Sequence, residues 1–298
     1  MNSSPLIFVL YDSVTNSVFE GQVKNLLHNL AHKNPYQPIH LVSFERNPQE
    51  MAQVKNISIT YLQRMPFIGA ISIWYATHQL KSFLRIFPEY SIIARGPLAA
   101  LIAQRSMRTE ICKQFIVQAR GLLAQEYAYS RAPSSSWWSQ LRYRLRIRQL
   151  HTVEQRAYGT LQSQLKWLPF FAQQSLKKTI EAVSPALRDY LVDTFGADKE
   201  SIIIAQHDIP KPITAEQKTT WRTEIRTQLG IPDDWIVYCY NGSGKKWQKP
   251  EDIITFFKER LVASPNVFLL LPLGAGVVCH AGSSPRSAAR MIPGGTTV

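Results

Sequence analysis

Short apolar segments alternate with helix-like segments through the first two thirds of this 298-residue chain. The first apolar segment, residues 6–10, reads Leu-Ile-Phe-Val-Leu and has no polar position, as in a strand covered on both faces of a parallel sheet. The next segment, residues 19–30, has Val or Leu at i, i+3, i+4 and i+7 from residue 23, which is helical spacing. Because parallel strands are joined by crossover helices, the alternation predicts an α/β fold with a doubly wound parallel sheet.

The same alternation continues to about residue 209. Further strands are expected at 39–44, 57–62, 91–94, 115–118, 180–183 and 202–205, and further helices at 71–87, 98–105, 137–167 and 186–195. Ser184 and Pro185 form a typical helix start, and Gly196 a typical helix end. We therefore predict an N-terminal Rossmann-like domain over residues 1–209, with a long basic helix at about 137–167.

A second cycle begins after a polar, helix-forming linker at residues 210–228. A strand at 235–240, a helix at 250–261 and a strand at 267–271 predict the start of a second Rossmann-like domain over residues 229–271. Residues 272–298 contain no acidic residue and show no strand or helix periodicity. We therefore expect an irregular tail that is foreign to the fold, as after a frameshift, and an incomplete second domain.

The charge balance narrows the class of partner. The chain has 34 Lys and Arg against 21 Asp and Glu, a net charge of +13, which favours nucleic acid, acidic lipid or phosphorylated small molecules. Nothing besides charge supports nucleic acid, so it is not an expected partner. The three cysteines and seven histidines lack zinc-site spacing, and no metal is expected. No secretory signal or membrane span is visible, so a cytoplasmic location is expected.

An arginine-rich stretch lies in the long helix. Between Arg131 and Arg148 there are five arginines and no acid, with Trp137 and Trp138 nearby. Such a mixture is typical of a helix at an anionic membrane surface, on the inner face of the membrane, while a solvated helix surface is the alternative. The residues assigned to this membrane surface are Arg142, Arg144, Arg146 and Arg148.

A glycine-containing loop follows the first strand of the second cycle. Such a loop before a helix presents backbone N–H groups to phosphate, whereas a plain turn that needs glycine is the alternative. It is not a Walker A loop, because Cys239 and Lys246 stand where that motif has Gly and Ser or Thr. The candidate residues for binding a phosphate are Gly242, Ser243, Gly244, Lys245 and Lys246.

Polar residues also follow the strands of the first domain. Ligands bind at the carboxyl ends of strands in such sheets, and Arg suits phosphate or carboxylate. Pairing of the arginines with Glu110 or Glu126 is the alternative. The candidates for a ligand site at this edge are Glu20, Gly21, Gln22, Arg95, Arg120 and Gly121.

Five segments together resemble the glycosyltransferase family 4 group, which has the GT-B fold. They are residues 19–22, 118–121 with Glu126, 181–187, 202–210 and 238–248, within a resemblance that runs from about residue 6 to 271. The resemblance implies two Rossmann-like domains, an acceptor on the first, a nucleotide-sugar on the second, retention of anomeric configuration and no obligatory metal. It also implies that Gly242 and Ser243 lie against the donor phosphates, with the other candidates of that loop beside them. The candidates at the strand edge of the first domain are assigned to an acceptor or interdomain cleft, with Gly21 facing the domain junction.

Two departures from the family pattern bear on activity. Many members have a His where this chain has Arg120, so the role of that His is not transferred. The family's paired-glutamate motif has no counterpart, because no carboxylate follows Glu259. Two hypotheses therefore stand: a sugar transferase that uses a nucleotide-sugar as substrate and a saccharide or lipid-linked acceptor, inactive if the second domain is truncated, and a noncatalytic membrane-peripheral or binding remnant that uses the basic helix. No catalytic residue is assigned.

Overall fold

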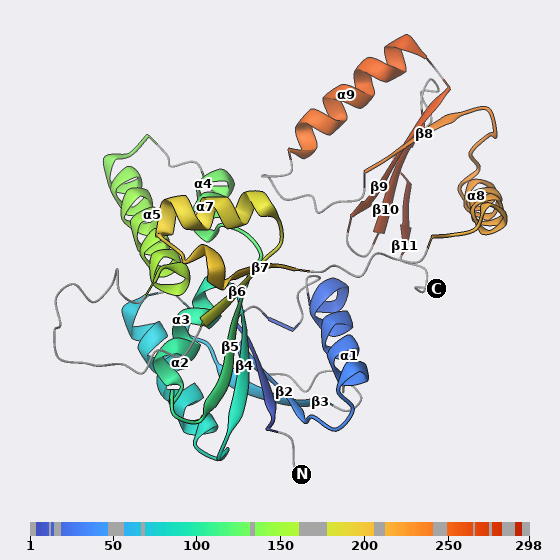
Figure 1. The fold of residues 1–298 in the computed structure, drawn as a ribbon. Coiled ribbons are helices and arrows are strands. Elements are labelled where there is room, and N and C mark those ends of the chain that lie inside the picture. The colour runs from blue at the N-terminus through green and yellow to red at the C-terminus, as the bar shows by residue number, and fades with distance from the viewer. Residues whose placement is uncertain are drawn as a thin grey trace. The chain divides into compact units, whose positions relative to one another are not determined.

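The chain forms two compact units. The computed structural model describes residues 4–11, 13–14, 19–46, 57–66, 69–131, 135–160, 178–205, 212–240, 249–264, 266–273, 276–281 and 290–293. Unit 1 is Met1–Gln206 and unit 2 is His207–Val298 (Figure 1). The sequence predicts this division after residue 209, close to the observed boundary.

Unit 1 is built on a seven-stranded sheet in the order β3-β2-β1-β4-β5-β6-β7. All neighbouring strands in this sheet run parallel. The strands are β1 (Leu6–Leu10), β2 (Ile39–Glu45), β3 (Ile57–Gln63), β4 (Tyr90–Arg95), β5 (Cys112–Ala119), β6 (Lys178–Ala182) and β7 (Ile202–Ile204). The predicted α/β fold with a parallel sheet is confirmed.

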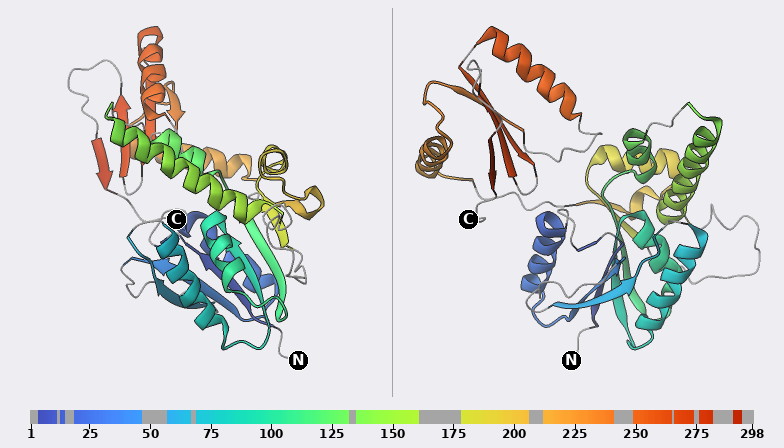
Figure 2. Two further views of the ribbon diagram at one scale, coloured as in Figure 1. Left: turned by 90° about the vertical axis from the view of Figure 1, so that its left-hand side faces the viewer. Right: turned by 180° about the vertical axis from the view of Figure 1, so that it is seen from behind.

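Helices cover both faces of this sheet. They are α1 (Lys24–Lys33), which follows a π-helical turn at Phe19–Val23, α2 (Ala70–Leu84), α3 (Gly96–Ser106), α4 (Leu123–Ser130), α5 (Trp137–Tyr158) and α7 (Pro185–Phe195). Leu27 of α1 packs with Phe8 and Ile93 on one face. Helices α2, α3, α5 and α7 contribute to the core on the other face. Figure 1 shows α1 on one side of the sheet and α2 and α3 on the opposite side, and the right-hand view of Figure 2 shows the same arrangement from behind.

The ends of α7 follow from local sequence. Ser184 Oγ accepts a hydrogen bond from the Leu187 N–H at 3.2 Å, and Pro185 is the first helical residue. Gly196 ends the helix with φ 63°, a left-handed conformation that glycine adopts without a steric penalty. The predicted start and end of this helix are confirmed.

Helix α5 is shorter than predicted: it ends at Tyr158, not near residue 167. The ammonium group of Lys178, at the start of β6, donates to the carbonyls of Ala157, Tyr158 and Gly159 at 2.9, 3.1 and 2.8 Å. Carbonyls of the last helical turn have no partner within the helix, so the half-buried Lys178 satisfies them here. The capping residue is about 20 residues distant in sequence, which is why local periodicity did not reveal the helix end.

Unit 2 contains a four-stranded sheet in the order β11-β10-β9-β8. The parallel strands β8 (Ile236–Cys239) and β9 (Val267–Leu273) are joined by α9 (Pro250–Ala263), which is one βαβ unit. The predicted linker contains α8 (Ala215–Leu229), which begins at a capping box of Thr214 and Gln217.

The tail differs from its predicted irregular structure at two segments. β10 (Gly276–Ala281) pairs antiparallel with β9, and β11 (Arg290–Pro293) pairs antiparallel with β10. The open edge of β9 offers unpaired backbone groups to any adjacent segment, so short strands can form there without alternating hydrophobicity. The prediction of an irregular tail is therefore wrong for residues 276–281 and 290–293.

Candidate functional site

Three polar residues form a row across neighbouring strands at the carboxyl edge of the unit 1 sheet. Arg95 of β4 is the register partner of Gln118 of β5, and Gln118 is the partner of Glu181 of β6. Register partners in a parallel sheet point to the same face, and here it is the face that carries Phe8, Ile93 and α1. Arg95 is only 7% exposed and Gln118 only 1%, so a charged side chain and a polar side chain are buried at this edge of the sheet.

Arg95 joins this row to the turn before α1. Its Nη2 donates to Gln22 Oε1 at 2.5 Å, across 73 residues of sequence. The residue after it, Gly96, has φ 79°, which lets the chain pass from β4 directly into α3. The Arg-Gly pair thus places a guanidinium at the end of a strand and turns the backbone away from it.

Arg120 and Gln118 share the carboxylate of Glu181. Arg120 Nη2 lies 3.0 Å from Glu181 Oε1, and Gln118 Nε2 lies 3.3 Å from the same oxygen. Burial lowers the pKa of the Arg120 guanidinium, and the Glu181 carboxylate partly offsets this effect. Arg120 therefore pairs with Glu181, and not with Glu110 or Glu126 as the sequence alternative held.

Gln118, Arg120 and Glu181 form a polar cluster, and two polar atoms of this cluster have no hydrogen-bond partner among the residues that the structure describes. They are Gln118 Oε1, an acceptor, and Arg120 Nε, a donor, and both are buried. Buried polar groups are nearly always hydrogen-bonded, because an unmade bond costs about 1–3 kcal/mol. A group that can both donate and accept a hydrogen bond, such as a hydroxyl or a water, would satisfy this acceptor and this donor.

The loop after β5 brings two more carboxylates to this end of unit 1. A Cβ at Gly121 would lie 2.3 Å from Glu126 Oε1, so the glycine lets the Glu126 side chain lie against the backbone. Glu154 of α5 accepts from the Ala124 N–H at 3.3 Å, at the start of α4. Burial raises the pKa of the Glu154 carboxyl to about 7, although the N–H groups of Ala124 and Leu123 favour its charged form.

Gln118, Glu154 and Glu181 were not predicted as site residues from the sequence. Glu154 is a lone acid between buried Leu150, Val153 and Ala157 of α5, a position where a charged residue calls for a partner. Gln118 is similarly a polar residue directly after the apolar run Phe115–Val117 of β5. A polar residue inside an otherwise apolar segment was therefore the available signal.

The remaining predicted site residues are placed as follows. Gly21 is exposed, with nothing within 4 Å of an added Cβ, and Gln22 is bonded to Arg95. The backbone of Glu20 belongs to the π-helical turn. The donor-phosphate candidates Gly242, Ser243, Gly244, Lys245 and Lys246 lie outside the described residues, between β8 and α9.

The described ranges contain neither a grouped set of metal ligands nor a helix that could span a membrane. Within them, no three His, Cys, Asp or Glu side chains are grouped so that they could hold a metal ion. No helix in that part of the chain has both the length and the apolar character needed to cross a bilayer.

No protein-family model and no curated protein sequence matches the chain. The chain is, however, similar to several solved structures. The chain is similar to WaaG, a glycosyltransferase involved in lipopolysaccharide biosynthesis, at 11% identity over 89% of this chain and 62% of that one, with a TM-score of 0.58. It is similar to sucrose-phosphate synthase from Thermosynechococcus elongatus at 14% identity over 96% and 64%, also with a TM-score of 0.58. The lipopolysaccharide outer core galactosyltransferase WaaB matches at 11% identity over 91% and 69%, with a TM-score of 0.51.

The chain thus spans 62% and 64% of the first two structures. At identities of 11–14% the likeness concerns the arrangement of helices and strands. The chain has a mixed α/β architecture that matches the GT-B fold of these glycosyltransferases.

Proposed function

We propose that this chain transfers a sugar from a nucleotide-sugar donor to a saccharide or lipid-linked acceptor. The polar row at the carboxyl edge of unit 1 holds the acceptor in this proposal, since ligands of open α/β sheets bind outside the carboxyl ends of the strands. The GT-B-like fold supports the reaction class. The observation that supports an acceptor site here is that two buried polar atoms, Gln118 Oε1 and Arg120 Nε, have no hydrogen-bond partner among the described residues.

A sugar hydroxyl has the hydrogen-bonding groups that these two atoms lack. It accepts a hydrogen bond from Arg120 Nε and donates one to Gln118 Oε1. Because the Glu181 carboxylate already binds both side chains, it holds them in place and offsets the charge of Arg120. The Arg120–Glu181 pair is then close to neutral.

The donor is proposed to bind through the loop after β8. Gly242, Ser243 and Gly244 offer backbone N–H groups before α9, and Lys245 and Lys246 add positive charge. The diphosphate that leaves gains negative charge as the sugar bond breaks, and these groups stabilise it. Retention of anomeric configuration and independence of metal are proposed on the family resemblance alone.

The experiment is a transfer assay with the full chain. Radiolabelled UDP-, GDP- and ADP-sugars are each incubated with a mixture of oligosaccharide and lipid-linked acceptors, and label in the product is counted. We expect transfer from one nucleotide class, and a fall of about 100-fold in kcat/KM for the variant Lys245→Gln/Lys246→Gln, since charge-assisted contacts to a leaving phosphate contribute about 1.5–3 kcal/mol.

The matched control removes two exposed lysines from helices of unit 2, in the variant Lys218→Gln/Lys258→Gln. It loses the same charge and is expected to keep wild-type activity. Absence of transfer from every donor would contradict the proposed reaction. Equal losses in the two variants would contradict the assignment of the phosphate site.

A further inference from the structure

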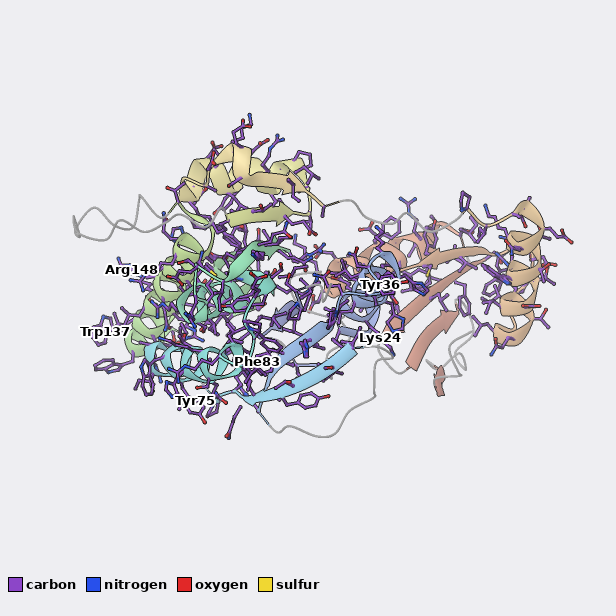
Figure 3. The ribbon with its side chains drawn as sticks, turned by 60° about the horizontal axis from the view of Figure 1, so that its bottom comes forward. Lys24, Tyr36, Tyr75, Phe83, Trp137 and Arg148 are labelled. Carbon is purple, nitrogen blue, oxygen red and sulfur yellow. The ribbon has the colours of Figure 1, made fainter. Side chains whose placement is uncertain are left out.

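Helix α5 exposes an apolar strip on its outer face. Trp137 and Trp138 are each 63% exposed and Leu145 is 53% exposed, whereas Leu150 and Val153 further along the helix are buried in the core of unit 1. Large apolar side chains seldom stay this exposed in a group unless the face has a partner. Figure 3 shows Trp137 and Arg148 on α5, at the same outer side of unit 1.

Helical geometry places these residues together. At about 100° per residue, Trp137, Trp138, Leu145 and the half-buried Leu141 fall within one sector of about 100°. Arg142 borders this sector on one side and Arg144 on the other. Arg148 continues the strip one turn after Leu145. The result is an apolar strip with arginines along its edges and at its C-terminal end.

Three of these arginines are free to bind a partner. Arg142, Arg144 and Arg148 are exposed and make no ion pair with any described residue. Arg146 differs from the sequence expectation, since it is half-buried and its Nη1 donates to Gln149 Oε1 at 2.7 Å. The basic surface is therefore Arg142, Arg144 and Arg148, and Arg146 is not part of it.

We infer that this face of α5, formed by Trp137, Trp138, Leu141, Leu145 and the three arginines, docks on an anionic lipid bilayer. Indole rings favour the boundary between headgroups and acyl chains, and arginine stems bury their methylenes while the guanidinium groups reach the phosphates. An amphipathic helix with basic edges binds in the plane of that boundary. This inference does not depend on the proposed sugar transfer.

Charge and chemistry favour lipid over the other possible occupants. A second copy bound symmetrically would bring the same arginines against each other, which is repulsive. Single-stranded nucleic acid would stack on the indoles but would leave Leu141 and Leu145 against polar groups. An acidic bilayer satisfies the arginines and the leucines together.

The test is co-sedimentation of the full chain with vesicles of phosphatidylcholine, alone or mixed with phosphatidylglycerol. We expect binding to the mixed vesicles only, and binding that weakens with added salt. The variant Arg142→Gln/Arg144→Gln/Arg148→Gln should partition on the order of 100-fold more weakly, since each arginine near an anionic surface contributes about 1 kcal/mol. Trp137→Ala/Trp138→Ala should weaken partition at least about tenfold.

Matched controls remove equivalent groups elsewhere. Lys33→Gln/Lys81→Gln/Arg85→Gln loses three exposed charges from α1 and the end of α2, and Trp221→Ala/Ile225→Ala loses two exposed apolar side chains from α8. Both controls should bind vesicles as the wild type does, and circular dichroism should show all four variants folded. The changed side chains are all exposed, so misfolding is not expected.

Three outcomes would overturn the inference. The first is equal binding to neutral and anionic vesicles, or none to either. The second is equal loss in the α5 variants and the controls. The third is a different occupant of this face. It would be seen as a dimer in analytical ultracentrifugation, or as binding to a single-stranded oligonucleotide but not to vesicles, provided that the α5 substitutions abolish the dimer or the oligonucleotide binding.

Discussion

The Nη2 atom of Arg120 lies 3.0 Å from Oε1 of Glu181, so an ion pair joins the ends of two neighbouring parallel strands. About a fifth of each side chain is exposed, which makes this pair more buried than the other ion pairs that are described. Gln118 binds the same carboxylate and stands next to Arg95 in the row. The ion pair therefore organises the polar cluster that the proposed acceptor site depends on.

Arg120→Met should lower the free energy of unfolding by about 2 kcal/mol, because it leaves the partly buried Glu181 carboxylate without its cation. Urea denaturation measures this change. The control is Arg188→Met, which removes a more exposed pair with Asp189 and should cost less than about 0.5 kcal/mol. In the double variant Arg120→Met/Glu181→Gln the loss should be smaller than the sum of the single losses, and simple additivity would show that the pair is not coupled.

Glu154→Gln should remove a pH dependence of stability. The folded pKa of about 7 lies above the value of 4.5 for a free carboxyl, so the folded state holds this proton more tightly. The stabilisation is fully present below about pH 4.5 and is lost as pH rises through about 7. Relative to the variant, the wild type should therefore lose up to about 3 kcal/mol between pH 4.5 and 8.

Urea unfolding over a pH series measures this difference. Gln keeps an oxygen that accepts from the Ala124 N–H, so the variant should fold. The control Glu200→Gln changes an exposed acid and should follow the wild type at every pH. A difference between Glu154→Gln and wild type that is the same at pH 5 and pH 8 would refute the raised pKa.

Gly159→Ala should destabilise unit 1 by about 2 kcal/mol or more. A Cβ there would lie 2.6 Å from the Gln155 carbonyl oxygen and 2.8 Å from that of Phe195, and backbone atoms cannot move aside cheaply. Gly21→Ala is the matched control, because nothing lies within 4 Å of its added Cβ. Thermal unfolding compares the two, and equal melting temperatures would argue against the close approach of α5 and α7 at Gly159.

Lys178→Met should lower the free energy of unfolding by about 1–3 kcal/mol, since three partly buried carbonyls at the end of α5 lose their hydrogen-bond donor. Lys113→Met is the control, because that lysine is exposed and pairs only with exposed Glu89. Amide hydrogen exchange should also show faster opening of the last turn of α5 in the first variant. Unchanged exchange there would mean that the lysine does not cap the helix.

Local sequence signals were sufficient where the structure depends on local contacts. Ser184, Pro185 and Gly196 set both ends of α7, and the apolar runs identified the strands of the parallel sheet. The end of α5 depends on Lys178, which is distant in sequence, so periodicity predicted too long a helix. β10 and β11 form against the edge of β9, and their own composition gives little sign of it.

The candidate site was predictable only in part for the same reason. Two Arg-Gly pairs after strands indicated that Arg95 and Arg120 stand at one edge of the sheet. Their partners are Gln22 and Glu181, which are 73 and 61 residues away, and only the strand order brings them together. The missing hydrogen bonds of Gln118 Oε1 and Arg120 Nε depend on the three-dimensional arrangement of the cluster, so the sequence could not reveal them.

The most direct test of the acceptor site is the Michaelis constant for the acceptor in Gln118→Met, compared with Gln114→Met, which changes an exposed glutamine nearer the start of the same strand. Circular dichroism establishes that both variants are folded. The acceptor site at Gln118 predicts that only Gln118→Met raises the acceptor KM, by about tenfold, while the KM for the nucleotide-sugar stays unchanged in both. An unchanged acceptor KM in folded Gln118→Met, or an equal rise in both variants, would contradict it.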